Sequence, residues 1–266
     1  MSRLPLFTTL GAGPTILMLH GIGGGHRAFA PQVETFAASG YRAVAWDMPG
    51  YGRSAPVEPY NFKALAQSCI ALIDGLRCGT VTLLGHDIGG MVAQEVVARR
   101  PELVDRLILC GTASTFGRDA DGRVSQALRD EFVTRSVAPL DAGNDMTTLA
   151  QTLVPRMVGP AALPEGVQLA THCMAHVNAS AYRKAVEAMS TFDRQAALLD
   201  IRVPTLLMAG EHDRETPPAS MKKMAQDIAG STYLELKGVG HLQNLESPDD
   251  FDGLVLNFLA LPRVLH

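Results

Sequence analysis

Asp87 is the residue with the greatest chemical consequence, and it lies in the run LLGHDIGG at residues 83–90. The pattern glycine–x–nucleophile–x–glycine is typical of a nucleophile elbow, a tight turn that lifts a reactive side chain above a parallel sheet. The usual residue there is serine, whose alkoxide adds to a carbonyl carbon and gives an acyl-enzyme. A carboxylate attacking an ester would have to form an anhydride, but at a saturated carbon it can form an alkyl ester that water then cleaves. The identity of the residue at position 87 therefore bears on whether the chain hydrolyses esters or instead opens epoxides or removes halogens.

Two later segments supply candidate partners for this nucleophile. Residues 206–213 (LLMAGEHD) are an apolar run that ends at Asp213, and residues 238–241 (GVGH) end at His241. The chain order nucleophile, acid, histidine is that of α/β-hydrolases. We expect Asp213 to orient His241 and to balance its charge, and His241 to activate water or the nucleophile. Glu211 is an alternative acid.

A glycine-rich segment, HGIGGG at residues 20–25, follows the first buried apolar run. Glycines allow the backbone to approach a substrate closely, so we expect Gly21 to line the substrate pocket. The backbone N–H groups of Ile22 and Ile88 are expected to form an oxyanion hole.

Elements that could position these residues alternate along the chain. Short apolar runs predict buried strands at residues 15–19, 41–46, 81–84, 106–110, 205–209 and 232–236. Helical periodicity predicts helices at residues 62–76, 91–100, 220–228 and 249–259. This alternation indicates an α/β fold with a mostly parallel central sheet and helices on both faces.

Residues 115–194 break the alternation, with helical segments, several proline and glycine breaks and no convincing strand. We interpret this stretch as a helical cap inserted into a core of residues 1–114 and 195–266. A cap over the carboxyl ends of the strands would exclude water and shape a pocket, and Tyr182 is its candidate substrate contact. A helical insertion that serves only packing or dimerisation is the alternative.

Several other side chains are expected to be structural. His172 and His176 have i, i+4 spacing, but no third ligand is suggested, so we expect no metal. His86 is expected to point away from the nucleophile, and Asp47 and Arg53 to fix a Pro-Gly turn. Four methionines are expected to fill the core: Met91, Met157, Met174 and Met189.

Bulk composition excludes several classes of function. The 266 residues are 47% hydrophobic and 19% charged, with a formal net charge of −4, which gives no electrostatic signal for nucleic acid or an anionic membrane. The four cysteines have no C-x-x-C spacing and are expected to be reduced, as in a cytoplasmic protein. We expect no signal peptide, no membrane span, no cofactor and a small-molecule substrate, whereas the oligomeric state is not readable.

Over nearly its whole length the chain resembles the α/β-hydrolase superfamily, and it looks most like the group of 3-oxoadipate enol-lactonases and small carboxylesterases. The segments that carry this resemblance are WDMPGYGRS at residues 46–54, FD at 192–193, IRVPT at 201–205 and GHLQNLESP at 240–248. In that group the elbow residue is serine. The resemblance therefore implies an ester or lactone hydrolase scaffold, from which this chain departs at Asp87.

The pattern Gly-His-Asp-x-Gly-Gly around Asp87 resembles epoxide hydrolases, haloalkane dehalogenases and fluoroacetate dehalogenases instead. Haloalkane dehalogenases place tryptophan after the aspartate to hold the halide, where this chain has Ile88; its single tryptophan is Trp46. Epoxide hydrolases carry a proline where this chain has Gly23, and use cap tyrosines to protonate the epoxide oxygen. Tyr182 is the cap tyrosine that this chain offers.

Three hypotheses follow. In the first, the chain is an ester or lactone hydrolase scaffold acting on a small, mostly apolar molecule, with Asp87 in the place of serine through engineering or natural divergence. In the second, it is an epoxide hydrolase or dehalogenase that uses Asp87 to form an alkyl-enzyme ester. In the third, it binds a small molecule without turnover, an alternative that the intact pair of Asp213 and His241 disfavours.

Overall fold

A seven-stranded sheet forms the centre of the molecule. The computed structural model describes residues 4–118 and 122–262, and within them the strand order is β1-β3-β2-β4-β5-β6-β7. Only the pairing of β1 with β3 is antiparallel, and the other neighbouring strands are parallel. The strands are β1 (Phe7–Leu10), β2 (Thr15–Leu19), β3 (Arg42–Trp46), β4 (Val81–His86), β5 (Val104–Cys110), β6 (Thr205–Gly210) and β7 (Thr232–Leu236).

Both faces of the sheet are buried, because successive side chains of a strand point to opposite sides. In β2, Ile16 and Met18 belong to one hydrophobic cluster, whereas Leu17 and Leu19 belong to the other. The strands are therefore apolar throughout rather than alternating with polar residues, as expected for a parallel sheet covered on both sides.

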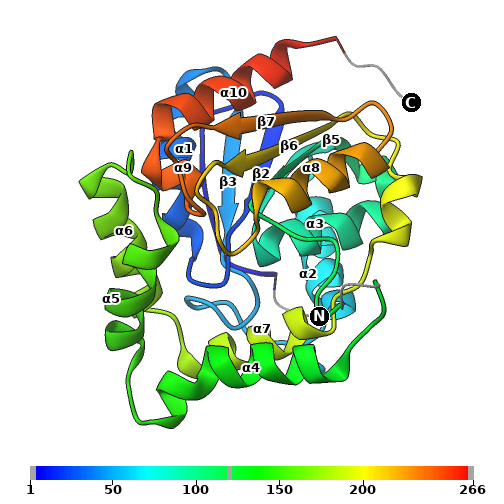
Figure 1. Ribbon diagram of the computed structural model, residues 1–266. Helices are drawn as coiled ribbons and strands as arrows, with labels where there is room; N and C mark the ends of the chain where they lie inside the picture. The colour runs from blue at the N-terminus through cyan, green and yellow to red at the C-terminus, as the bar shows by residue number, and fades with distance from the viewer. Residues whose placement is uncertain (1–3, 119–121, 263–266) are drawn as a thin grey trace.

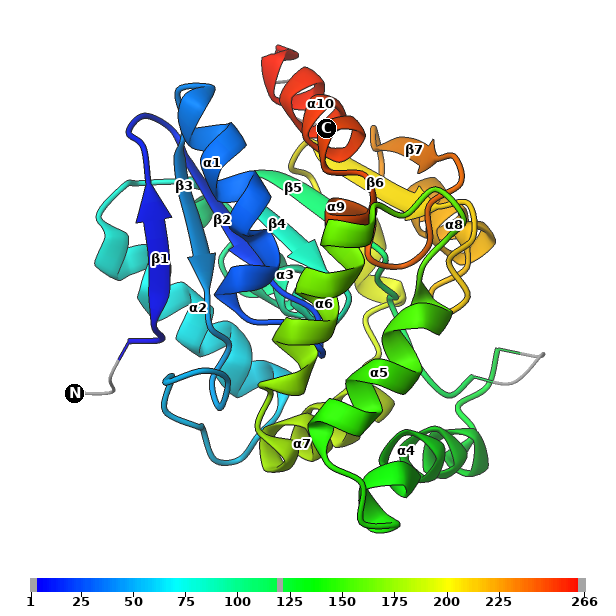
Figure 2. The same ribbon diagram turned by 90° about the vertical axis from the view of Figure 1, so that its left-hand side faces the viewer.

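Helices from different parts of the chain cover the two faces. Helices α1 (Ala30–Ala38) and α10 (Pro248–Ala260) contribute to the cluster that contains Ile16, whereas α2 (Phe62–Leu76), α3 (Ile88–Arg99) and α8 (Pro218–Asp227) contribute to the opposite cluster. Figure 2 shows α1 in front of the sheet and α2 and α3 behind it.

Four helices between β5 and β6 lie outside the sheet. They are α4 (Gln126–Asp141), α5 (Met146–Met157), α6 (Pro164–Ala175) and α7 (Ala179–Ser190). Figure 1 shows them in green along the left and lower sides of the molecule. Side chains from α5 and α6 reach the carboxyl ends of the strands, where Asp87 lies. The division into a core and a cap at residues 115 and 194 stays a prediction.

The predicted fold class is confirmed, with differences at the ends of elements. The edge strand β1 and the helix α1 were not predicted, and α3 begins at Ile88 rather than at residue 91. β1 is mostly exposed and only four residues long, so it has no apolar run to reveal it. The sequence pattern did not predict the first turn of α3, because it contains the glycines at positions 89 and 90 and glycine disfavours a helix interior.

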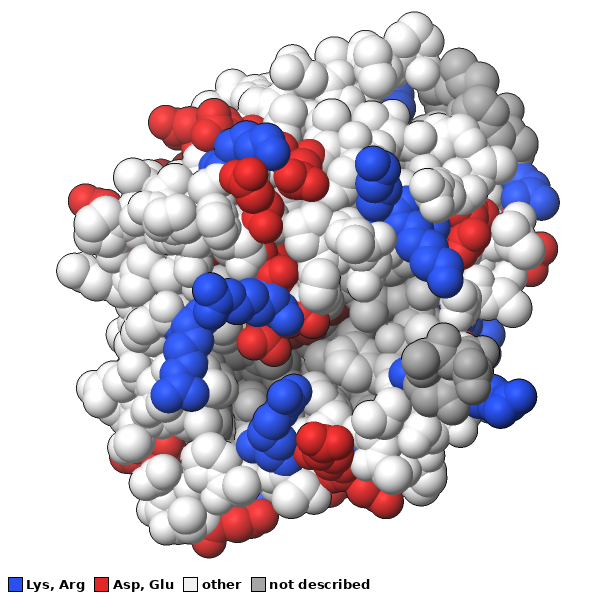
Figure 3. Space-filling view, viewed as in Figure 1, with Lys and Arg blue, Asp and Glu red and all other residues white. Residues whose placement is uncertain are grey.

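The surface agrees with the modest net charge. On the face shown in Figure 3, acidic and basic side chains are interspersed around a central hollow rather than gathered by sign. Within the described residues, the helices are too short or too polar to cross a bilayer.

Candidate active site

The turn between β4 and α3 holds Asp87 in a strained conformation. Its backbone has φ 52° and ψ −122°, and positive φ is costly for a residue with a Cβ atom. Close backbone approach requires glycine on both sides: a Cβ on Gly85 would lie 2.5 Å from the carbonyl oxygen of Gly89, and one on Gly89 would lie 2.1 Å from that of Leu19. The hydroxyl of Thr112 donates to the Asp87 carbonyl oxygen at 2.7 Å. The surrounding structure thus fixes the elbow that the sequence predicted.

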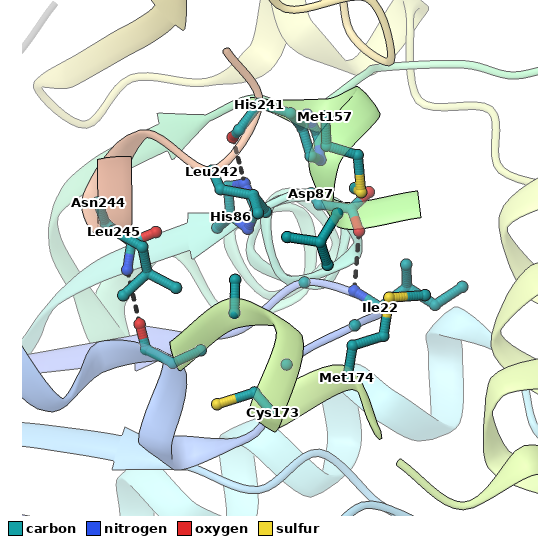
Figure 4. Close-up of a pocket in the computed structure, with 16 residues that line it drawn as sticks. Ile22, His86, Asp87, Met157, Cys173, Met174, His241, Leu242, Asn244 and Leu245 are labelled. Carbon is teal, nitrogen blue, oxygen red and sulfur yellow. Dashed lines mark hydrogen bonds between the residues drawn. The ribbon is translucent and has the colours of Figure 1, made fainter. Parts of the chain in front are cut away.

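One oxygen of the Asp87 carboxylate occupies the position expected for an oxyanion. The backbone N–H of Ile22 donates to Asp87 Oδ2 at 2.8 Å, and the backbone amide of Ile88 also bonds to this carboxylate. Burial raises the pKa of Asp87, and the charge of His241 and these two amides oppose that rise. Figure 4 shows the other carboxylate oxygen turned toward Met157.

Asp213 and His241 form a buried acid–histidine pair. His241 Nδ1 donates to Asp213 Oδ2 at 3.0 Å, and the hydroxyl of Thr216 donates to the same oxygen at 2.6 Å. Burial alone would raise the pKa of Asp213, but the charge and hydrogen bond of His241 and the bonds from Thr216 lower it. Burial alone would lower the pKa of His241, yet Asp213, Asp87 and Glu215 together raise it to about 9. At neutral pH His241 is therefore an imidazolium paired with the Asp213 carboxylate.

Two further histidines support the catalytic loops in neutral form. The backbone N–H of Met48 donates to His20 Nε2 at 3.0 Å, so His20 Nδ1 carries the proton and donates to the Gly21 carbonyl at 2.8 Å. Burial lowers the pKa of His20 to about 4. Burial, followed by the charge of His241, lowers the pKa of His86 to about 3, and its Nε2 donates to the His241 carbonyl at 2.8 Å.

A small cavity of about 40 Å³ lies against Asp87 and His241. The wall formed by the cap is apolar or weakly polar, with Val154 and Met157 on α5 and Met174 on α6. Figure 4 shows Cys173 and Met174 on one turn of α6, with Asp87 and His241 on the other side of the cavity. The space holds roughly three water-sized groups, which limits the reacting part of a substrate to a few atoms.

The structure brings together most of the predicted site residues. The cavity is lined by Asp87, His241, Ile22 and Gly21, and Ile88 and Asp213 lie directly behind them through their hydrogen bonds. Their catalytic roles stay predictions.

Three expectations about neighbouring side chains need correction. Tyr182 is buried in α7 and does not line the cavity. Glu211 is exposed and binds Lys237 and the backbone N–H of Gly238, so it is not the partner of His241. His86 lines the cavity rather than pointing away from it, because its ring bonds to the His241 loop.

Other lining residues were not predicted as site residues. Met157 and Met174 line the cavity although their sequence pattern predicted only core packing. Leu242 and Asn244 also line it, and their place directly after His241 is a signal that could have found them. No comparable signal marks Cys173, because the orientation of the cap helices decides which side chains face inward.

Metal ligation finds no support in the described part of the chain. No group of three or more His, Cys, Asp or Glu side chains in residues 4–118 and 122–262 is placed to hold an ion. The rings of His172 and His176 lie 4.3 Å apart on α6, and His172 Nε2 accepts from Arg27 at 3.5 Å.

Known proteins with similar sequences and structures share this arrangement of elements. A family model described as the alpha/beta hydrolase fold matches residues 14–248. The chain is 30% identical to the protein named "Putative carbamate hydrolase RutD" of Azorhizobium caulinodans, over 93% of this chain and 92% of that protein. It is 28% identical to 3-oxoadipate enol-lactonase 2 of Acinetobacter baylyi, over 91% of this chain and 87% of the other. The crystal structure of the enol-lactonase of Burkholderia xenovorans superposes with a TM-score of 0.84 at 27% identity and covers 96% of each chain.

Proposed function

The chain belongs to the α/β-hydrolase fold family, and on that premise we propose that it hydrolyses a small, mostly apolar molecule in the cavity beside Asp87. The observation that carries this proposal is the buried assembly of Asp87, His241 and Asp213 against that cavity. An imidazolium paired with the Asp213 carboxylate can move protons, and the apolar cap wall excludes water from the remaining space.

We propose an ester or lactone as the bond that is cleaved. The similar proteins support this choice by their names, a carbamate hydrolase and two enol-lactonases, since each name describes the addition of water at an acyl carbon.

At an acyl carbon, Asp87 acts on water rather than on the substrate. The carboxylate takes a proton from water as the water oxygen bonds to the carbonyl carbon, and His241 gives its Nε2 proton to the leaving oxygen as the carbon–oxygen bond breaks. The proton on Asp87 then returns to His241, so that the water hydrogens end on the leaving group and on the acid. The raised pKa of Asp87 makes it a stronger base than an exposed aspartate.

One specific observation favours a second candidate, the opening of an epoxide or alkyl halide through an alkyl-enzyme ester. The backbone amide of Ile22 already donates to Oδ2 of Asp87 itself, and the amide of Ile88 acts to lower the pKa of the same carboxyl group. These amides would stabilise the oxyanion that forms when water attacks the Asp87 carboxyl carbon of such an ester. No indole in this cavity could hold a leaving halide, because Trp46 is fully buried at the end of β3 and is absent from the cavity lining.

Isotope incorporation in a single turnover distinguishes the two reactions. The protein in excess is mixed with a short-chain ester, a lactone, an epoxide or a haloalkane in H₂¹⁸O, and the product and the peptide that contains Asp87 are weighed by mass spectrometry. Direct attack by water on an ester places ¹⁸O in the product acid and none in Asp87. Hydrolysis of an alkyl ester places ¹⁸O in Asp87.

Two variants complete the test. Asp87→Ser should give a pre-steady-state burst on an activated ester if the scaffold serves acyl chemistry, because serine can form an acyl-enzyme. His241→Ala should abolish turnover of any true substrate, so an unchanged kcat in that variant would refute the catalytic assembly. No turnover across the whole panel would indicate the binding-only alternative.

A further inference from the structure

A second, larger hollow lies beside the catalytic cavity, on the outer side of the glycine-rich loop. This groove, of about 560 Å³, runs between the β1 strand, the loop at residues 24–27, the turn at residues 51–53 and the cap helix α6. We call it the outer groove.

The outer groove and the catalytic cavity share two wall residues. Gly24 and Cys173 line both spaces, one from the core and one from the cap. The hydroxyl of Tyr51, a further groove residue, donates to the carbonyl of Ile22 at 3.0 Å, on the same loop that supplies the oxyanion amide. A molecule larger than the cavity of about 40 Å³ could therefore keep its reacting bond at Asp87 and extend into the groove.

Positive charge dominates the walls of the outer groove. Arg27 and Arg53 both line it, against one lining carboxylate, Asp47. Asp47 is buried, and its Oδ1 already accepts from the His26 backbone at 2.9 Å and bonds to the His26 ring at 3.0 Å. The two guanidinium groups are left without a carboxylate partner in the described structure.

The Arg27 side chain lies on the groove side of the wall that the two spaces share. Its guanidinium donates to the imidazole Nε2 of His172 at 3.5 Å, a contact that brings no carboxylate to Arg27. Burial raises the pKa of the Cys173 thiol to about 11, the Arg27 charge opposes this rise and the Asp47 charge adds to it, so both charges lie close to a residue that the two spaces share.

We propose that the outer groove is a carboxylate-binding subsite, so that the substrate is a small apolar molecule that carries one acidic end. The proposal rests on the proposed function, whose substrate class it narrows. A guanidinium is planar and can bind a carboxylate through two parallel hydrogen bonds, which gives both orientation and charge recognition. The acidic end lies against Arg27 and Arg53 while the apolar part passes between Gly24 and Cys173.

Binding of a simple carboxylate tests this subsite without any turnover. Butanoate, its neutral analogue butanamide and inorganic phosphate are titrated into protein with isotope-labelled histidines. The ring resonances of His172 and His176 are followed by NMR, and the dissociation constants come from calorimetry. Butanoate should shift both rings, butanamide should shift neither, and the exposed His212 should not respond.

The variant R27Q/R53Q should weaken butanoate binding by at least tenfold, because it removes both guanidinium charges that donate hydrogen bonds to the carboxylate. A matched control is R183Q, which removes one half-buried arginine that pairs with Asp141 on the far part of the cap, and it should leave butanoate binding unchanged.

Each other outcome overturns the proposal. Unshifted His172 and His176 rings, or equal affinity in the double variant, would exclude a carboxylate subsite. Phosphate binding as tight as butanoate would identify a general anion site instead. The same titration with His241→Ala distinguishes the proposed hydrolysis from the proposed carboxylate subsite, because that variant should lose turnover and keep butanoate binding.

Discussion

The environments of Asp87 and Asp213 differ in ways that suit different tasks. Asp213 accepts hydrogen bonds from His241, Thr216 and the backbone of Glu215, which keep its pKa low despite burial. Asp87 has fewer donors, and burial raises its pKa. Two carboxylates whose pKa values are pushed apart are typical of a division of roles, with one group holding charge and the other exchanging protons.

Asp213→Asn should lower kcat by on the order of 10³–10⁴-fold on any accepted substrate, because the amide no longer orients and balances His241. Steady-state kinetics on the best substrate of the panel measures this effect. Glu211→Gln is the matched control, since Glu211 lies on the same loop but faces solvent, and it should retain activity. Similar losses in both variants would contradict the assignment of Asp213.

His241 should make a pH-dependent contribution to stability. Its pKa rises from 6.5 to about 9 on folding, so the stabilisation is full below pH 6.5 and is lost as the pH rises through about 9. Urea denaturation of the protein and of His241→Gln at pH 6, 7.5 and 9 should therefore show a gap in the free energy of unfolding that narrows with pH. A constant gap would argue against a charged His241.

Asp87, unlike His241, should destabilise the folded protein at neutral pH. Because its pKa is raised above 3.8 in the folded state, the loss of stability begins as the pH rises above 3.8, grows until the pH passes the folded pKa, and is constant above it. Asp87→Asn should unfold at a higher temperature than the parent at pH 7, and the difference should shrink as the pH falls toward 4. A less stable variant at pH 7 would show that the hydrogen bonds of Asp87 outweigh its burial.

At the scale of elements, the buried strands and the elbow were predictable because each depends on local sequence. Continuous apolar runs identify β2 and β4, and the glycines at positions 85 and 89 mark a close backbone approach that a residue with Cβ could not make. The cap wall of the site was not predictable. Whether Met174 or Tyr182 faces the cavity depends on the packing angles of α6 and α7, which no short sequence pattern encodes.

The loop that carries His241 is fastened to the cap by a buried carboxylate. Glu246, in α9 (Gln243–Glu246), accepts from the backbone N–H groups of Gly159 and Gly240 at 2.7 Å and of Leu242 at 2.8 Å. The backbone N–H of His241 donates to the Met157 carbonyl at 2.7 Å. His241 and the α5 wall of the cavity are therefore held together by hydrogen bonds.

Glu246→Gln should lower kcat on the order of 10²-fold, because an amide cannot accept all three bonds and small displacements of a catalytic group are costly. The pH–rate profile should shift as well, since His241 would lose its fixed place beside Asp213. Asp252→Asn is the control: it alters another buried carboxylate, bonded to Gln32 and not to the site. Equal loss of activity in both variants would show that Glu246 stabilises the fold in general and does not position His241 in particular.

At the scale of the whole molecule, the parallel sheet positions Asp87, Asp213 and His241, and the cap forms the facing wall of the cavity. The nucleophile position, the acid and the histidine all follow the carboxyl ends of strands, where ligands bind in open α/β sheets. The wall that faces them comes from α5 and α6, so substitutions of the side chains of these helices that line the cavity should alter its shape.

The free cysteines are placed in regions that should open at different rates. Cys69 in α2 and Cys110 at the end of β5 are buried, and burial raises the pKa of both thiols; burial raises that of Cys173 on α6 to about 11. A thiol reagent attacks only the exposed thiolate, so each modification waits for the fluctuation that uncovers its sulfur. Timed alkylation followed by peptide mapping should show Cys173 reacting before Cys69 and Cys110. The rate at Cys173 would then report local opening of the cap, and the rates at Cys69 and Cys110 would report global unfolding.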